Sequence, residues 1–443
     1  MNKLNIASDI ISKALKLGAS DADAIIIDST SLNTEVRLEK LINIERSENR
    51  ALGLRVLING QQAIVSTADL SKDSLDNMLE RCIAMAKVTP KNPHLSLATK
   101  EQMAKEIKNL DLYDANEPSA EELIKRATET EQFALSNEAI TNSEGASASY
   151  YTNKIYFVTS NGFARSYQTS GSALSVSVLA GKNENMQADY AFSQARFAES
   201  LKSSKEIGME AANRTINKLN PRKLATGEMP VIFDKRVARG LLGAFASSVN
   251  GSSISRGTSF LIDHLGKEIF TSKVNIIDDP FILRALGSRS FDAEGFLGEK
   301  LNIIENGVLN HYFLDLQTAS KLKMQSTGHA VRGISSSPSP SCTNLYMQAG
   351  ESSLEEMIKS IKKGLLVTEV FGHGANIVTG EYSQGAGGFY IENGEIVYPV
   401  SEITIASNLK SMFSQIIPAS DLKFESNVNS PSLLIEKMTV AGA

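Results

Sequence analysis

Hydrophobic residues follow two different spacings in the first part of the chain. Between residues 4 and 15 they recur at helical spacing, and Gly18 can end the helix that this spacing predicts. Residues 21–70 instead contain short runs in which apolar and polar side chains alternate, with Asn59-Gly60 as a hairpin signal. We expect four or five antiparallel strands in this region.

Helical spacing returns at residues 71–88 and again after residue 118. The intervening segment, 90–118, is polar and contains prolines, which predicts a connector with little core. Ser119 precedes two acidic residues and an apolar run that ends near Leu135, a pattern typical of a capped helix N-terminus. Both helical segments are therefore predicted to be helices.

Residues 140–197 again alternate between apolar and polar positions, and Asn161-Gly162 separates two of the runs. These strands form either a second sheet or a continuation of the first. A helix is predicted at residues 204–219. The short polar stretch 221–228 that follows it is the expected main domain boundary.

The C-terminal part begins with a short apolar strand that ends at Asp234. This aspartate can cap a helix that continues to residue 250, where Gly251 offers a stop. Beyond it, short strands broken by glycine predominate, and helices are predicted at 353–363 and 407–416.

Strands and helices are grouped along the chain rather than strictly alternating, which favours an α+β fold. We expect an N-terminal domain, residues 1–225, with an antiparallel sheet, helices and the internal connector 90–118. A β-rich C-terminal domain is expected at 226–443. The 443 residues exceed the roughly 250–300 at which single hydrophobic cores stop growing, which agrees with two domains.

Composition and charge exclude several classes of protein. The formal charge of -5 comes from 50 acidic and 45 basic residues, and no basic run exceeds a pair, so nucleic acid is not expected as a partner. No apolar run approaches the ~18 residues that span a bilayer, and the N-terminus lacks the apolar core of a signal peptide. We expect no membrane partner and a cytoplasmic location. Cys82 and Cys342 fit this reducing compartment as structural thiols.

Glycine is concentrated in residues 372–388, and an alternating hairpin with the tip Glu392–Glu395 follows. A glycine-rich strand edge can let an extended peptide approach and pair with it. We therefore predict a peptide-binding role near the substrate channel for a group of residues in this stretch; the alternative is that the glycines only shape a tight β-turn. The group is Thr379, Gly380, Glu381, Tyr382, Ser383, Gly385, Gly387 and Gly388.

No catalytic or metal-binding motif is visible. A zinc helix needs two histidines about one turn apart, whereas the closest of the five histidines, His311 and His329, are 18 residues apart. No Gly-x-Ser-x-Gly nucleophile motif occurs, and the glycines at 385–388 lack the Lys-Ser/Thr ending of a phosphate loop. Asp292 and Glu294 could be an acid–base pair if they lay on a strand, but the neighbouring glycines favour a polar loop whose carboxylates are solvated or hold backbone amides.

Residues 372–413 closely resemble the C-terminal signature of the TldE/PmbA branch of the TldD/PmbA family. This family, once described as modulators of DNA gyrase, is regarded as a two-subunit peptidase. Four further blocks resemble the family and extend the likeness over most of residues 226–443; they are Ile277–Pro280, Asp292–Gly295, Asn306–Leu309 and Ser339–Tyr346. Before residue 226 the likeness is one of layout and scattered positions.

The resemblance also implies what this chain lacks. Catalytic TldD-type subunits carry an HExxxH zinc helix shortly before an Arg-Gly-Thr-Ser segment, which here is Arg256–Ser259. Counting back, the two histidine positions fall on Leu242 and Ser247 and the glutamate position falls on Gly243. None of these can bind the ion or polarise its water. The C-terminal cysteine ligand of the catalytic branch is missing as well.

The resemblance therefore implies a subunit with no catalytic residue and no metal ligand of its own. Zinc is expected in a TldD-type partner, with which this chain forms a heterodimeric peptidase that cleaves unfolded or leader peptides. The alternative from another class is a non-enzymatic regulatory protein that acts on gyrase or toxin–antitoxin targets. A metal-independent hydrolase that acts alone is a third reading.

Overall fold

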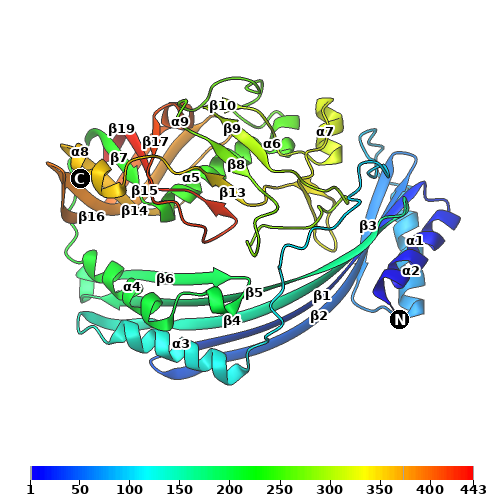
Figure 1. Cartoon of the computed structure of the whole chain (residues 1–443), viewed down its shortest axis with the longest axis horizontal. Helices are drawn as coiled ribbons and strands as arrows, with labels where there is room; N and C mark the ends of the chain where they lie inside the picture. The colour runs from blue at the N-terminus through cyan, green and yellow to red at the C-terminus, as the bar shows by residue number, and fades with distance from the viewer. Residues whose placement is uncertain (1, 373, 443) are drawn as a thin grey trace.

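The computed structural model describes residues 2–372 and 374–442 of the chain. The N-terminal part is built on one six-stranded antiparallel sheet with the strand order β3-β2-β1-β4-β5-β6. Figure 1 shows that this long sheet curves beneath the C-terminal part of the molecule. The strands are β1 (Asp21–Arg37), β2 (Lys40–Ile58), β3 (Gln61–Thr67), β4 (Ile140–Thr159), β5 (Ala164–Ala180) and β6 (Gln187–Ala195).

Fewer and longer strands form this sheet than the sequence pattern predicts. Residues 21–70 form three strands rather than four or five, because β1 and β2 continue for 17 and 19 residues through polar stretches that resemble turns. The polar first half of β2 is exposed on both faces, so no burial pattern marks it as strand. The predicted Asn59-Gly60 hairpin is confirmed by φ angles of 50° and 78°. Residues 140–197 continue the first sheet instead of forming a second one.

Four helices cover one face of the sheet, and all four are predicted from the sequence. They are α1 (Lys3–Lys16), α2 (Lys72–Ala86), α3 (Ala120–Leu135) and α4 (Ser204–Asn217). Because side chains alternate along a strand, Ile26 packs with α1 and α2 and Leu32 packs with α3 and α4, while Ile25 points to the opposite face. Ser119 forms the predicted N-cap, with a complete capping box to Glu122.

The C-terminal part contains two more sheets around its own core. One has the order β16-β15-β14-β7-β19-β17 and closes on itself through pairing of β16 with β19; the other has the order β10-β9-β8-β13-β18. The first contains β7 (Gly227–Phe233), β14 (Lys363–Phe371), β15 (Glu381–Glu392), β16 (Glu395–Asn408), β17 (Ile416–Pro418) and β19 (Leu433–Ala441). The second contains β8 (Ile276–Asp278), β9 (Leu301–Glu305), β10 (Val308–Leu309), β13 (Leu345–Met347) and β18 (Val428–Asn429).

Short elements complete the C-terminal part, and the arrangement as a whole confirms the predicted α+β fold. The helices are α5 (Lys235–Ser248), α6 (Gly251–Ser255), α7 (Leu316–Leu322), α8 (Leu354–Ser360) and α9 (Leu409–Phe413), and β11 (Ala330–Val331) pairs with β12 (Ser339–Pro340). Two 3-10 turns, η1 (Asn183–Asn185) and η2 (Ala198–Ser200), lie in the N-terminal part. None of the helices in the described residues combines the length and apolarity that a bilayer crossing requires.

The predicted stop of α5 at Gly251 is wrong. The helix ends at Ser248, and Gly251 instead begins α6, with its backbone N–H donating to the carbonyl oxygen of Phe313 at 2.8 Å. A Cβ at this position would lie 2.7 Å from the side chain of Leu314. Glycine is therefore required here by close packing and not by a helix terminus.

The connector between α2 and α3 has a larger structural role than its polar sequence predicts. It is irregular, as expected, but Ala98, Met103 and Ala104 are buried. They pack in one cluster with residues of the N-terminal sheet and of the C-terminal part; these include Ile25, Phe157, Phe163, Phe291 and Phe296. The connector thus contributes to the core between the two parts of the molecule.

Candidate functional site

Helix α5 occupies the position at which the sequence comparison places a zinc helix. Asp234 caps it as predicted, its side chain accepting a hydrogen bond from the backbone N–H of Arg236 at 2.9 Å. Leu242 is buried in the core, Gly243 has no side chain, and the Ser247 hydroxyl donates to the Gly243 carbonyl oxygen at 2.9 Å. An alkyl group, a glycine and a hydroxyl that bonds its own helix do not form a zinc donor set.

The histidines do not assemble a metal site elsewhere in the described residues. His329 is buried, with its ring nitrogens 3.1 Å from Asp278 and 2.9 Å from the Thr327 hydroxyl, which is the bonding of a satisfied core residue. In the ranges 2–372 and 374–442, no three His, Cys, Asp or Glu side chains gather in a way that could hold an ion. His373 lies outside the described residues.

The predicted peptide-binding residues lie at the start of β15 and in the turn before it. Thr379 and Gly380 belong to the turn, and the other six residues, from Glu381 to Gly388, are on the strand. Glu381 and Ser383 are exposed, whereas the Tyr382 ring is buried and its hydroxyl donates to Gln384 at 2.8 Å.

The expected free edge at this strand does not exist. Strand β15 is hydrogen-bonded to β16 from Glu381 to Glu392 and to β14 from Gly385 onward. Before Gly385 its second edge is bonded to residues 374–376, where the Asn376 N–H donates to Glu381 at 2.8 Å and the Ser383 N–H donates to Gly374 at 2.9 Å, so both edges are used. A peptide cannot pair with β15 as an added strand, and this part of the prediction is wrong. The placement of these residues beside a substrate channel stays a prediction.

The glycines of β15 have packing roles. A Cβ on Gly388 would lie 1.9 Å from the Leu366 carbonyl oxygen in β14, and a Cβ on Gly387 would lie 2.4 Å from the Glu369 side chain. The hairpin tip has the predicted two-residue turn, with φ of 51° at Asn393 and 83° at Gly394. The glycine-rich sequence therefore reflects close strand packing as well as the turn.

Asp292 and Glu294 lie in a buried turn and not in a solvated loop. The Asp292 carboxylate accepts hydrogen bonds from the backbone N–H groups of Glu294, Phe296 and Ala330 at 2.8–3.0 Å. Glu294 accepts one from Leu316 at 2.9 Å. Of the two roles expected for these carboxylates, solvation or the binding of backbone amides, the structure shows the second. Burial raises the pKa of both groups, and each is engaged in the fold.

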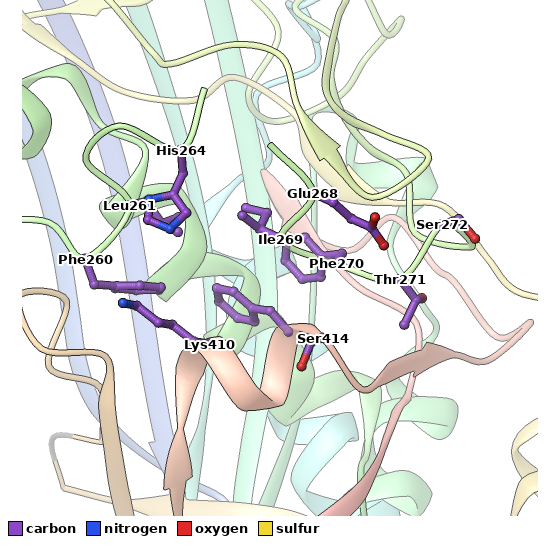
Figure 2. Close-up of a pocket in the computed structure, with 11 residues that line it drawn as sticks. Phe260, Leu261, His264, Glu268, Ile269, Phe270, Thr271, Ser272, Lys410 and Ser414 are labelled. Atoms are coloured by element: carbon purple, nitrogen blue, oxygen red, sulfur yellow. The ribbon is translucent and has the colours of Figure 1, made fainter. Parts of the chain in front are cut away.

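A half-open pocket of about 510 Å³ lies between α9 and the loop that follows α6. Figure 2 shows its lining: Phe260, Leu261, His264, Glu268, Ile269, Phe270, Thr271 and Ser272 from the loop, and Lys410, Phe413 and Ser414 from α9 and its end. Its aromatic rings continue into the core, where Phe245 of α5 packs edge-on against both Phe270 and Phe413. The pocket therefore lies over the counterpart of the zinc helix.

Backbone hydrogen bonds join this pocket to the predicted peptide-binding stretch. The Phe260 N–H donates to the Ile377 carbonyl oxygen at 2.8 Å, and the Leu409 N–H donates to Gly380 at 2.6 Å. Of the predicted residues, Gly380 makes one of these contacts, and none of the eight lines the pocket itself. His264, Lys410 and the aromatic rings were not predicted; the available signals were the Arg256–Ser259 block just before the loop and Phe413 at the end of the signature stretch.

Comparison with known protein families covers almost the whole chain. Residues 22–86 match the PmbA/TldA metallopeptidase domain 1, residues 113–219 match the central domain, and residues 226–442 match the C-terminal domain.

Individual relatives agree with this match. A protein of Haemophilus influenzae named metalloprotease PmbA homolog is 38% identical, over 97% of this chain and 94% of its own length. Buchnera aphidicola subsp. Acyrthosiphon pisum has a metalloprotease PmbA homolog that is 30% identical, over 100% of this chain and 97% of its own length. The same organism has a metalloprotease TldD homolog that is 28% identical, over 88% of this chain and 86% of its own length. The crystal structure of a candidate modulator of DNA gyrase from Bacteroides thetaiotaomicron superimposes with a TM-score of 0.91 at 28% identity, covering 99% of this chain and 98% of that one.

Proposed function

The chain belongs to the PmbA/TldD metallopeptidase family, and we propose that it is the non-catalytic subunit of a two-chain zinc peptidase. In this proposal a TldD-type chain holds the zinc ion and cleaves unfolded or leader peptides in the cytoplasm. The present chain, of the TldE/PmbA type, completes the peptide-binding chamber and stabilises its partner.

The residues of α5 are the observation that carries the proposal. Zinc hydrolysis needs imidazole ligands and a carboxylate that handles the proton of the attacking water. At the three corresponding positions this chain has Leu242, Gly243 and Ser247, and the leucine side chain belongs to the core. We derive no catalytic step from these residues, because they cannot hold the ion.

Two further observations support a pairing with a catalytic chain. Buchnera has PmbA and TldD homologues that each align with most of this chain, so two chains of one architecture occur in the same organism. In addition, nothing lies within 4 Å of the Cβ positions of Gly240 and Gly243, so that face of α5 is open. Two neighbouring glycines on an open helix face let a peptide or a partner backbone approach closely.

The proposal is tested by reconstitution with the TldD-type chain of the same organism. Size-exclusion chromatography measures association, and cleavage of an unstructured fluorogenic peptide measures activity. We expect no cleavage by the present chain alone, cleavage by the mixture, and complete loss when a zinc chelator is added. A TldD-type chain with glutamine in place of its motif glutamate is the matched control, since it should associate without cleaving.

Two results would contradict the proposal. Chelator-sensitive cleavage by the present chain alone would show that it binds a catalytic metal by residues other than those of α5. Absence of association with the TldD-type chain would instead favour the regulatory alternative, for which the description of the Bacteroides structure as a candidate modulator of DNA gyrase is the motivating observation.

A further inference from the structure

We propose that the pocket between α9 and the loop after α6 binds a short zwitterionic peptide with an apolar side chain. The peptide carboxylate would face Lys410, its ammonium group would face Glu268, and its side chain would cover the aromatic rings between them. The proposal concerns the isolated chain and does not depend on the role of the chain in a two-chain peptidase.

The aromatic floor of the pocket is rigid and already formed. Phe270 and Phe413 stack with centroids 4.6 Å apart and an interplanar angle of 23°, and Phe260 lies 6.1 Å from Phe413. Phe245 supports them from α5. Little conformational entropy is therefore lost when an apolar group covers these rings. The volume of about 510 Å³ is within the range of small-ligand sites.

One end of the pocket favours a carboxylate. Figure 2 shows His264 and the Lys410 ammonium group at this end, close to Phe260. The Nδ1 atom of His264 lies 2.8 Å from the Ile262 carbonyl oxygen, which can only accept, so Nδ1 carries a proton and the ring is held in place as a wall of this end, while Lys410 supplies the positive charge. Within the described residues, Lys410 has no carboxylate within 4.0 Å, so its charge is available to a ligand.

The opposite end favours a cation. Figure 2 shows the Glu268 carboxylate beyond Ile269 and Phe270, on the far side of the rings from Lys410. Glu268 also has no basic partner within 4.0 Å in the part of the chain that is described. Figure 2 shows that Thr271 and Ser272 add hydroxyl groups on this side of the pocket. Opposite charges separated by an apolar floor match the ammonium, side chain and carboxylate of a short peptide.

The experiment uses isothermal titration calorimetry of the purified chain with the dipeptide Leu-Phe, its C-terminal amide and its N-acetyl form. We expect saturable one-to-one binding of Leu-Phe, and at least about tenfold weaker binding of each blocked form, because each loses a charge-assisted contact. The Lys410→Met variant should bind Leu-Phe more weakly by a similar factor. It should bind Leu-Phe and its C-terminal amide with equal affinity, because the partner of the carboxylate is gone. The Glu268→Gln variant should likewise bind Leu-Phe more weakly, and it should bind Leu-Phe and its N-acetyl form with equal affinity.

Both substituted side chains are exposed, so the variants should fold, which their unfolding temperatures can verify. Lys125→Met on α3, whose side chain is 74% exposed and far from the pocket in sequence, is the matched control and should bind Leu-Phe normally. Absence of saturable binding by the unmodified chain up to about 10 mM, or equal affinity for acid and amide, would overturn the proposal. Neither outcome would affect the reconstitution test of the two-chain peptidase, which measures association and chelator-sensitive cleavage.

Discussion

Asp23 of β1 forms a buried ion pair with Arg332, which follows it by 309 residues and belongs to the C-terminal part of the chain. Both side chains are fully inaccessible to solvent. Asp23 also accepts from Arg55 of the neighbouring strand β2 at 2.6 Å. One carboxylate therefore contacts two buried guanidinium groups, and it links the N-terminal sheet to the C-terminal part.

Replacement of Asp23 by asparagine should strongly destabilise the protein. The substitution removes the carboxylate that forms ion pairs with the buried Arg55 and Arg332, and breaking a buried ion pair in this way typically costs about 3–5 kcal/mol. Urea unfolding followed by circular dichroism measures the loss. Asp28→Asn is the control, because Asp28 pairs with Lys3 and with the exposed Arg50, 2.7 Å away, near the surface, and this variant should lose only about 0–1 kcal/mol. Equal losses in the two variants would contradict this account.

Glu294→Gln should make the protein more stable than the unmodified chain, by an amount that grows with pH. Burial raises the pKa of Glu294 well above its ordinary value, and Asp292 and Asp315 raise it further. A carboxyl group whose pKa is raised on folding lowers stability as pH increases above its pKa in the unfolded chain, which is about 4.3. Glutamine removes this penalty and can still accept the hydrogen bond from Leu316.

The measurement for Glu294 is the free energy of unfolding at several pH values. The two proteins should differ least below about pH 4, where the unfolded carboxyl group is protonated as well. The exposed Glu402, whose side chain is 70% accessible, provides the control variant Glu402→Gln, for which no such trend is expected. If the free energy of unfolding varied with pH in the same way for Glu294→Gln and for the unmodified chain, the buried Glu294 carboxyl group would not be the cause of the pH dependence.

Two glycine substitutions should change stability in opposite directions. Gly388→Ala places a Cβ 1.9 Å from the Leu366 carbonyl oxygen, so the strands must separate, at a cost of about 1–3 kcal/mol. Gly243→Ala adds a Cβ that meets nothing within 4 Å inside α5, and alanine is favoured over glycine in a helix by about 1 kcal/mol. Urea midpoints of the two variants measure both effects. A destabilised Gly243→Ala protein would show that the open helix face is needed by the isolated chain.

Neither thiol should react with Ellman's reagent in the native protein at pH 8. Burial raises the pKa of both Cys82 and Cys342 to about 12, and the reactive thiolate is therefore scarce. In denaturant both thiols should react, since both cysteines are free. Rapid reaction of a thiol in the native protein would contradict this prediction. Cys342 would then be the expected site of reaction, because it is more exposed than Cys82.

Local features of the sequence predicted those elements that depend on few neighbouring residues. The Asn59-Gly60 and Asn393-Gly394 turns need positive φ angles, which these residue types supply in any context. Apolar spacing at 3.6 residues and the capping serine Ser119 predicted helices α1 to α4 for the same reason. The missing zinc donors on α5 also follow from residue identity, because leucine, glycine and serine lack the required groups wherever they lie.

Tertiary structure decided what depends on distant partners. The continuation of β2 through an exposed polar stretch, and the loss of a free edge at β15, are set by the pairing of β1, β14 and β16, which leaves no pattern within the strand itself. The pocket combines residues 260–272 with residues 410–414, and the Asp23–Arg332 pair spans most of the chain. Such contacts join residues that are far apart in the chain, so the local spacing of residues along the sequence does not predict them.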